Sequence, residues 1–417
     1  MKRILILLVL TISIQSFSQK ITDTLISKKL NEDREITIVL PESYAKNKTK
    51  KYPLVVLLDG DYLLEPFQGA LNYGAYWDDL PEVIIVAISQ NKKDERATDC
   101  VWDEASGLPM DKGEEFFEFI GAEIIPYIEK KYRVTPFKII AGHDITAGFL
   151  NFFLYKEHPL FNGYISLSPE FPTGMEEEIP TRLSKIEKPI FYYHATADGD
   201  LKDIQAKAKK LDDAMATVKK PSLNYQFDSF KGTSHYSLVL RAIPNALYQF
   251  FAIYQPISIN EFNEKIVTLP SGYSEYLDKK YQAIESNFDI KKPIRLNDFR
   301  AIEAAILKNK DYNDFDGLAI LADKWYPKSM LSEYELAMMY EKKGDNKNAV
   351  KHYLAGQQKE PIGNLTKNMM FEKADALKKT LPKKGKAAPV EEIPVEQTPE
   401  QTPEQTPEQV PTEKKTE

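Results

Sequence analysis

The sequence predicts an α/β fold with a mostly parallel sheet flanked by helices, followed by a smaller all-α, repeat-like region and a disordered tail. Two observations lead to this prediction. Between residues 20 and 256, short continuous apolar runs alternate with longer amphipathic runs, which is typical of a parallel sheet covered on both faces. From residue 257 the strand pattern stops, and helical periodicity continues to residue 381.

Strands and helices alternate along the first region. The predicted strands are 34–41, 52–60, 82–89, 137–142, 163–169, 188–195 and 223–227. The predicted helices are 114–132, 146–157, 201–218 and 237–254. A ligand site in such a sheet lies outside the carboxyl ends of the strands, so we expect functional residues in the turns that follow them.

The region 257–381 is predicted to be a helical, tetratricopeptide-like domain. The spacing of that repeat is matched by Leu336, Ala337, Tyr340, Gly344, Ala349, Tyr353, Gly356 and Pro361. A helical pair of this kind either forms a groove for an envelope protein partner or packs on the first domain. Residues 382–417 carry TPEQ repeats with few apolar side chains, and we expect a disordered tail because they cannot bury a core.

The amino terminus has the features of a secretory signal, predicted at residues 1–19. Lys2 and Arg3 precede an apolar run at 4–14, and Ser16 and Ser18 supply the small residues of a cleavage site. This run is too short to span a bilayer, and no other segment reaches that length. The sequence therefore predicts an exported protein, periplasmic or secreted, that is not integral to the membrane.

Composition and motifs exclude several classes of function. The 417-residue chain has a net charge of -7, so it lacks the basic surface that nucleic-acid binding requires. It has no glycine-rich phosphate loop, no HExxH motif and no paired CxxC, and no cofactor or metal is predicted. Asp59 and Asp61 flank Gly60 and could bind a cation, but a turn explains this pattern equally well.

The stretch AGHDITAGF, at residues 141–149, has the strand, sharp turn and helix order of a nucleophile elbow. In α/β-type hydrolases this turn reads Gly-x-Ser-x-Gly, and an acid and a histidine follow along the chain. Asp144 stands where the serine would be. We predict His235 as the base and Asp198 as the acid, with Asp200 and Asp203 as alternatives in the same loop and helix start.

Acyl transfer also needs two backbone N–H donors for the oxyanion. The predicted donors are the N–H of Ile145, which follows the elbow residue, and that of Asp61 or Tyr62, which follow the strand 52–60. Aromatic residues after the strands either line the cleft or pack within loops; they are Tyr62, Tyr73, Tyr76, Trp77 and Trp102.

These residues resemble the esterase family of α/β hydrolases that includes S-formylglutathione hydrolase, siderophore esterases and feruloyl esterases. The resemblance spans residues 36–254 and rests on YPLVVLLDGDYL, RATD, AGHDITAGF, HPLFNGYISLSPE and SHYSLVLRAIPNAL. It implies an esterase-like domain at 20–256, a small ester-like ligand, and the roles of acid and base for Asp198 and His235.

The elbow departs from the family pattern, which is similar to Gly-His-Ser-x-Gly-Gly. Gly142 and His143 match it, whereas Asp144, Thr146 and Ala147 do not. We expect Asp144 to form an ion pair with His235 and Thr146 to crowd the turn. The expected function is therefore a catalytically altered or inactive hydrolase fold that acts as a binding or assembly module.

Two active alternatives stay open. Haloalkane dehalogenases and epoxide hydrolases use an elbow aspartate as nucleophile, and Asp144, His235 and Asp198 would suit those roles. Those enzymes carry a helical cap, however, and the sequence leaves only a short acidic loop within residues 170–187. A conventional ester hydrolase would need another nucleophile, Ser234 or Ser168.

Overall fold

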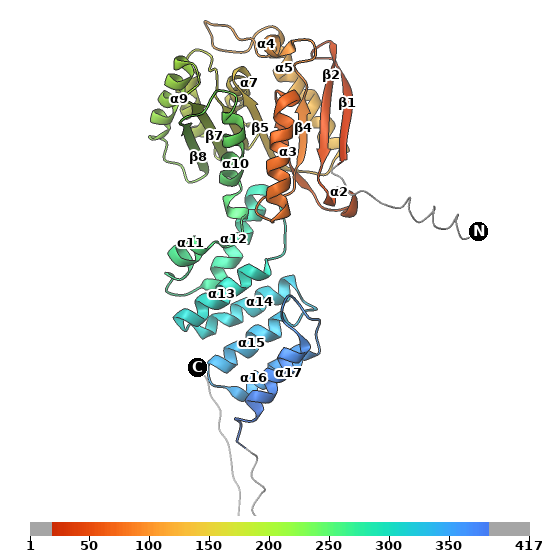
Figure 1. Ribbon diagram of the computed structural model, residues 1–417, viewed down its shortest axis with the longest axis vertical. Coiled ribbons are helices and arrows are strands. Elements are labelled where there is room, and N and C mark those ends of the chain that lie inside the picture. The colour runs from red at the N-terminus through yellow and green to blue at the C-terminus, as the bar shows by residue number, and fades with distance from the viewer. Residues whose placement is uncertain (1–18, 383–417) are drawn as a thin grey trace, which may run out of the picture.

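The computed structural model describes residues 19–382 of the chain. The predicted signal peptide, apart from Gln19, and the predicted tail, apart from Pro382, lie outside these residues. A sheet with flanking helices forms the upper part of the molecule in Figure 1, and a stack of helices forms the lower part. Within residues 19–382, no helix is both long and apolar enough to cross a membrane.

The sheet has eight strands in the order β1-β2-β4-β3-β5-β6-β7-β8. The first two pairs in this order are antiparallel and the remaining pairs are parallel, so the predicted fold class is confirmed. The strands are β1 (Gln19–Ser27), β2 (Glu32–Leu40), β3 (Tyr52–Leu57), β4 (Ile84–Ile88), β5 (Val134–His143), β6 (Gly163–Leu167), β7 (Ile190–Ala197) and β8 (Leu223–Phe230).

Helices cover both faces of the sheet because successive strand residues point to opposite faces. Val55 and Leu57 face one apolar core, while Leu54 and Val56 face the other. The first core is covered by α3 (Gly60–Tyr76) and α10 (Leu238–Phe250), which lie in front of the sheet in Figure 1. The second is covered by α5 (Lys112–Glu118), η1 (Phe119–Ile124), α6 (Ile125–Lys131), α7 (Ile145–Phe149), η2 (Leu150–Tyr155), α8 (Met175–Lys185) and α9 (Lys202–Met215).

Besides the short helices α2 (Ser43–Lys46) and α4 (Glu95–Asp99), three longer elements of this part are absent from the sequence prediction. The edge strand β1 has no predicted counterpart, and neither has α3, because Pro66 and several glycines obscure its periodicity. The acidic stretch after β6 is the helix α8, with Glu176, Glu177 and Glu178 in its first turn. Acidic side chains at this position are favoured by the helix dipole, a signal that the expectation of a charged loop overlooks.

The lower part of the described chain is helical. Its elements are α11 (Ile259–Glu261), η4 (Phe262–Ile266), α12 (Tyr273–Phe288), α13 (Leu296–Asn309), η5 (Tyr312–Asp314), α14 (Phe315–Trp325), α15 (Leu331–Lys342), α16 (Asn346–Gln357) and α17 (Lys367–Lys378). A Cβ added to Gly356 would lie 2.1 Å from Cε of Met370, the flexible end of that side chain, so α16 and α17 pack closely at this glycine. The tetratricopeptide assignment itself stays a prediction.

One apolar core joins the two parts. The Phe288 ring at the end of α12 packs on the rings of Phe137 in β5 and Phe251, with ring centroids 5.0 Å and 5.1 Å apart. The core that begins under α3 and α10 continues through these rings to residues of α14 and α15. The helical part therefore packs directly on the sheet-bearing part.

Candidate active site

Asp144 occupies a strained turn between β5 and α7. Its backbone has φ 62° and ψ -120°, a conformation that residues other than glycine rarely adopt. The turn is fixed by β6 and the residues after it, since Asp144 N–H donates to the Leu167 carbonyl at 2.9 Å and Glu170 N–H donates to the Asp144 carbonyl at 3.1 Å. The strand-turn-helix elbow expected from the sequence is therefore present, with 26% of the Asp144 side chain exposed.

His235 is oriented by Asp200. The His235 Nδ1 lies 2.7 Å from Asp200 Oδ1, and the other Asp200 oxygen accepts from Ser168 Oγ at 2.9 Å and from Ala197 N–H at 2.7 Å. The prediction that Asp198 plays this role is wrong: its carboxylate accepts from Gly232 N–H at 2.7 Å. Strand β7 ends at Ala197, so Asp198 lies in the turn that follows it. The turn brings Asp200 back to Ala197 N–H at the end of the strand, where it also contacts His235.

Asp203, the second alternative acid, is also not part of the site. It lies in the first turn of α9 and pairs with Lys207 on the same helix at 3.0 Å. The two serines considered as replacement nucleophiles are engaged elsewhere as well. Ser168 is buried and donates to Asp200, and Ser234 donates to Ser237 Oγ at 2.9 Å.

Arg96 is the nearest cation to Asp144. Its two terminal nitrogens lie 3.4 Å from Asp144 Oδ2, whereas His235 Nε2 lies 4.0 Å from Asp144 Oδ1. Both contacts are long for charged partners. The expected Asp144–His235 ion pair is therefore a loose contact, and Asp144 Oδ1 accepts no hydrogen bond from the described residues.

Asp59 fixes Arg96 in this position. The Asp59 carboxylate, fully buried, accepts from Arg96 Nε at 2.6 Å, from Thr146 Oγ1 at 2.6 Å and from Tyr62 Oη at 2.8 Å. Arg96 also donates to the His143 carbonyl at 2.8 Å. The sequence analysis used the RATD motif only for the family resemblance. A signal that could have identified Arg96 is its place in the segment that follows the buried strand β4, where it lies in the short helix α4 (Glu95–Asp99).

A buried polar chain supports Asp59 from behind. The backbone N–H of Asp59 donates to the side-chain oxygen of Gln90 at 2.9 Å, and the side-chain amide of Gln90 donates to Asp99 at 3.0 Å. Asp99 in turn pairs with the buried Arg34 of β2 at 2.5 Å. Asp61 points elsewhere and accepts from Ser89 Oγ and Gln90 N–H, both at 2.8 Å, so the two carboxylates of the DGD turn do not converge on a cation.

His143 links the elbow to the base. Its Nε2 lies 3.2 Å from the His235 carbonyl oxygen, and its Nδ1 lies 3.1 Å from Tyr62 Oη, whose single proton is donated to Asp59. Burial, followed by the charge on His235, lowers the pKa of His143 to about 4. His143 is therefore a neutral structural group between Tyr62 and the loop of the base.

Two pKa shifts describe the electrostatics around Asp144. The hydrogen bond to Asp200 raises the pKa of His235, burial opposes this, and the charge of Asp144 adds to the increase. Burial and then the charge of Asp144 raise the pKa of Glu170, which lies at the exposed rim of the elbow. The site thus combines a readily protonated histidine with several carboxylates.

The predicted oxyanion donors have different fates. Ile145 N–H begins α7, where the helix offers no acceptor for it, and Asp61 N–H lies in the first turn of α3. Tyr62 N–H is already donated to the Asp59 carbonyl at 3.1 Å, so Tyr62 is wrong as a donor. Tyr73, Tyr76 and Trp77 lie at the opposite end of α3 and do not line this site.

Comparisons with known proteins agree with this architecture. Residues 27–173 match the family described as "Putative esterase". A solved structure of an uncharacterised protein from Capnocytophaga ochracea is 33% identical, with a TM-score of 0.78, and the alignment covers 87% of this chain and 100% of that one. An IroE-like serine hydrolase from Shewanella oneidensis is 20% identical with a TM-score of 0.51, over 70% of this chain and 95% of its own, and shares the fold.

A search of curated protein sequences finds no significant match. The family match covers the strands that carry the elbow, and the Capnocytophaga structure extends the likeness over most of the chain. The chain belongs to the esterase-like family of α/β hydrolases.

Proposed function

We propose that this chain is an exported, esterase-fold protein in which Asp144 replaces the serine nucleophile, and that it binds a ligand at this site without carrying out serine-type acyl transfer. The observation that supports this proposal most directly is the carboxylate of Asp144 on an elbow whose base and acid, His235 and Asp200, remain in place. The signal peptide predicted at residues 1–19 supports the periplasm or the cell exterior as its proposed location.

The chemistry of a serine site fails at Asp144. A serine hydroxyl gives its proton to the histidine as it attacks, but an ionised carboxylate has no proton to give. Its negative charge also lies where the oxyanion of the substrate would develop. Loss of the nucleophile in a serine protease lowers kcat by about 10⁶-fold.

The same carboxylate suits a different ligand group. Asp144 Oδ1 has no hydrogen-bond donor among the described residues, and the neighbouring Glu170 is also acidic. We therefore propose that the ligand presents a hydrogen-bond donor, such as an N–H or O–H group, to Asp144.

An active hydrolase with Asp144 as nucleophile is the second candidate. The elbow geometry and the His235–Asp200 pair favour it, because a dehalogenase-type enzyme needs both. Two observations favour the first candidate. Both terminal nitrogens of Arg96 face the carboxylate and reduce its nucleophilicity, and only the short helix α8 lies between β6 and β7, where a cap would be inserted.

Hydrolysis of p-nitrophenyl acetate tests the proposal. We expect no turnover above buffer for the wild type and a measurable gain for Asp144→Ser, because that change restores the hydroxyl next to His235. The gain should vanish in Asp144→Ser combined with His235→Ala, which is the matched control. Robust wild-type turnover that is abolished in Asp144→Ala would contradict the proposal and establish the aspartate nucleophile.

A further inference from the structure

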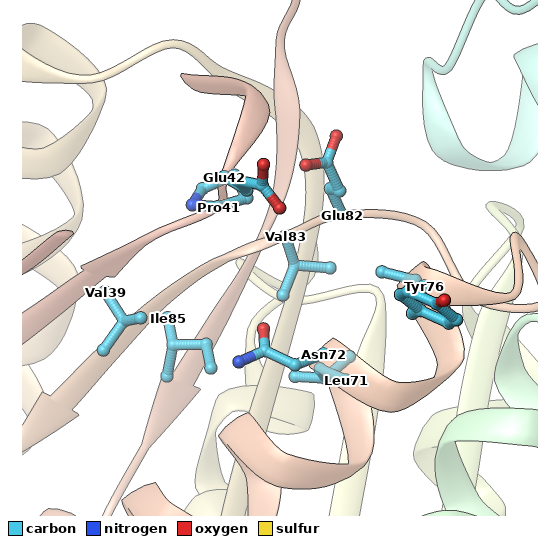
Figure 2. Close-up of a pocket in the computed structure, with 10 residues that line it drawn as sticks. Val39, Pro41, Glu42, Leu71, Asn72, Tyr76, Glu82, Val83 and Ile85 are labelled. Atoms are coloured by element: carbon cyan, nitrogen blue, oxygen red, sulfur yellow. The ribbon is translucent and has the colours of Figure 1, made fainter. Parts of the chain in front are cut away.

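A cavity lies at the edge of the sheet opposite to Asp144. It has a volume of about 270 Å³, just below the ~300–1,000 Å³ typical of sites for drug-sized molecules. Figure 2 shows its walls: Val39 at the end of β2, Leu71 and Asn72 near the end of α3, and Ile85 at the start of β4. Because β4 runs parallel to β5, its first residues and the elbow lie at opposite edges.

Exposed aromatic rings border this cavity. Tyr76 lines it and is 80% exposed, and Trp77 packs edge-on against Tyr76 with ring centroids 5.0 Å apart and is 58% exposed. Asn72 lies one helical turn before Tyr76, so both side chains project from the same face of α3. An amide and an aromatic ring thus stand together at the rim.

The carboxylates at the rim are compensated. Glu82 accepts from Lys50 at 2.5 Å and from Ser43 N–H and Oγ, and Glu42 pairs with Lys46 at 2.6 Å. The hydrogen bonds and the Lys50 charge keep the pKa of Glu82 low against the effect of burial. Because each carboxylate has a lysine, the rim offers hydrogen-bond acceptors without a strong preference for ionic ligands.

An apolar floor, aromatic rings and polar groups without net charge match the chemistry of a neutral sugar. A sugar ring presents C–H groups on its faces, which pack on aromatic rings, and hydroxyls at its edge, which bond to amides and carboxylates. We propose that this cavity is a binding subsite for a neutral saccharide. One sugar ring stacks on Tyr76 beside Trp77, and its hydroxyls bond to Asn72 and Glu82.

The proposal is independent of the Asp144 site and has a direct test. Cellotetraose, xylotetraose and chitotetraose are titrated against the full chain, and binding is followed by saturation-transfer NMR and tryptophan emission. We expect at least one of them to bind in the millimolar range. Tyr76→Ala should weaken that binding by tenfold or more, and Trp77→Ala should also weaken it.

Two control variants show whether binding belongs to this cavity. Tyr73→Ala removes an aromatic ring that is 66% exposed on the same helix but does not line the cavity, and it should leave binding unchanged. Asp144→Ala should also leave it unchanged. Because Tyr76 is highly exposed, its truncation should not alter the circular dichroism spectrum.

Three outcomes would overturn the proposal. The first is no binding of any of the three saccharides, and the second is equal binding by wild type and Tyr76→Ala. The third is a concentration-dependent dimer in sedimentation velocity that is lost in Tyr76→Ala, because it would assign the aromatic face to self-association.

Discussion

His235 is held on one side by a buried carboxylate and faces a second one across a longer gap. The Asp200 carboxylate accepts three hydrogen bonds and is buried, so it fixes the ring, whereas Asp144 contacts it only at 4.0 Å. Arg96 donates one short hydrogen bond to Asp59, at 2.6 Å, and contacts Asp144 only at 3.4 Å. At this scale, Asp144 has two weak partners, and 26% of its side chain is exposed.

The pair of variants Asp200→Asn and Asp198→Asn distinguishes the true acid from its neighbour. We expect Asp200→Asn to lower the pKa of His235, because the hydrogen bond to Asp200 is the main cause of its increase. Asp198→Asn should leave that pKa nearly unchanged. Proton NMR titration of the His235 ring measures both, and a larger effect from Asp198→Asn would contradict the assignment.

The free energy of unfolding should depend on pH through the His235–Asp200 pair. The pKa of His235 is raised on folding, so its contribution is complete below about pH 6.5 and is lost as pH rises through the folded-state value. The pKa of Asp200 is lowered on folding, against the effect of burial, by its bonds to His235, Ala197 and Ser168. Its contribution is therefore present above about pH 3.9 and is lost as pH falls through the folded-state value. Urea unfolding should show the largest loss for Asp200→Asn between these limits and a smaller loss near pH 9.

At the scale of the element, the elbow depends on Thr146, where the family pattern has glycine. The prediction that Thr146 crowds the turn is incomplete, because its hydroxyl accepts from His143 N–H at 2.9 Å and donates to the buried Asp59 at 2.6 Å. Gly142 provides the room for it: a Cβ there would lie 2.6 Å from Thr146 Oγ1. Gly142 therefore allows β5 and α7 to approach each other closely although Thr146 replaces the second glycine of the family pattern.

Thr146→Gly and Thr146→Ser test this role. We expect Thr146→Gly to lower the free energy of unfolding by about 1–3 kcal/mol, mainly because the buried Asp59 loses a donor; helix propensity adds only a few tenths of a kcal/mol, since threonine is itself a poor helix former. Thr146→Ser keeps the hydroxyl and should cost about 1 kcal/mol or less. Equal losses in urea unfolding would show that the hydroxyl is not what stabilises the elbow.

At the scale of the whole molecule, the helical part and the sheet share one core. Ionic contacts join the two parts as well as the rings around Phe288. Asp78, in the turn after α3, accepts from Lys292 at 2.9 Å and from Arg295 at 2.5 Å, and both of these residues lie between α12 and α13. A boundary at residues 256 and 257 would cut through this shared core. The two parts should therefore unfold together.

Phe288→Ala is the variant that tests the shared core. Removing a buried phenylalanine ring costs about 3–5 kcal/mol, so the variant should unfold in a single transition at a clearly lower temperature than the wild type. Ile320→Ala on α14 removes a side chain that is 63% exposed and should leave the transition unchanged. Calorimetry that resolves two transitions in the wild type, with Phe288→Ala shifting only one, would contradict a shared core.

The sequence by itself determined the order of seven of the eight strands and the place of the elbow. These features depend on periodicity and turn residues that are local in the chain, and Asp144 and His235 could be predicted from them. The tertiary structure alone decided that Asp200 is the acid, that Arg96 reaches Asp144 and that Tyr62 has no free N–H. The physical reason is that a carboxylate or guanidinium finds its partner across strands distant in sequence, within distances that neither spacing nor composition encodes.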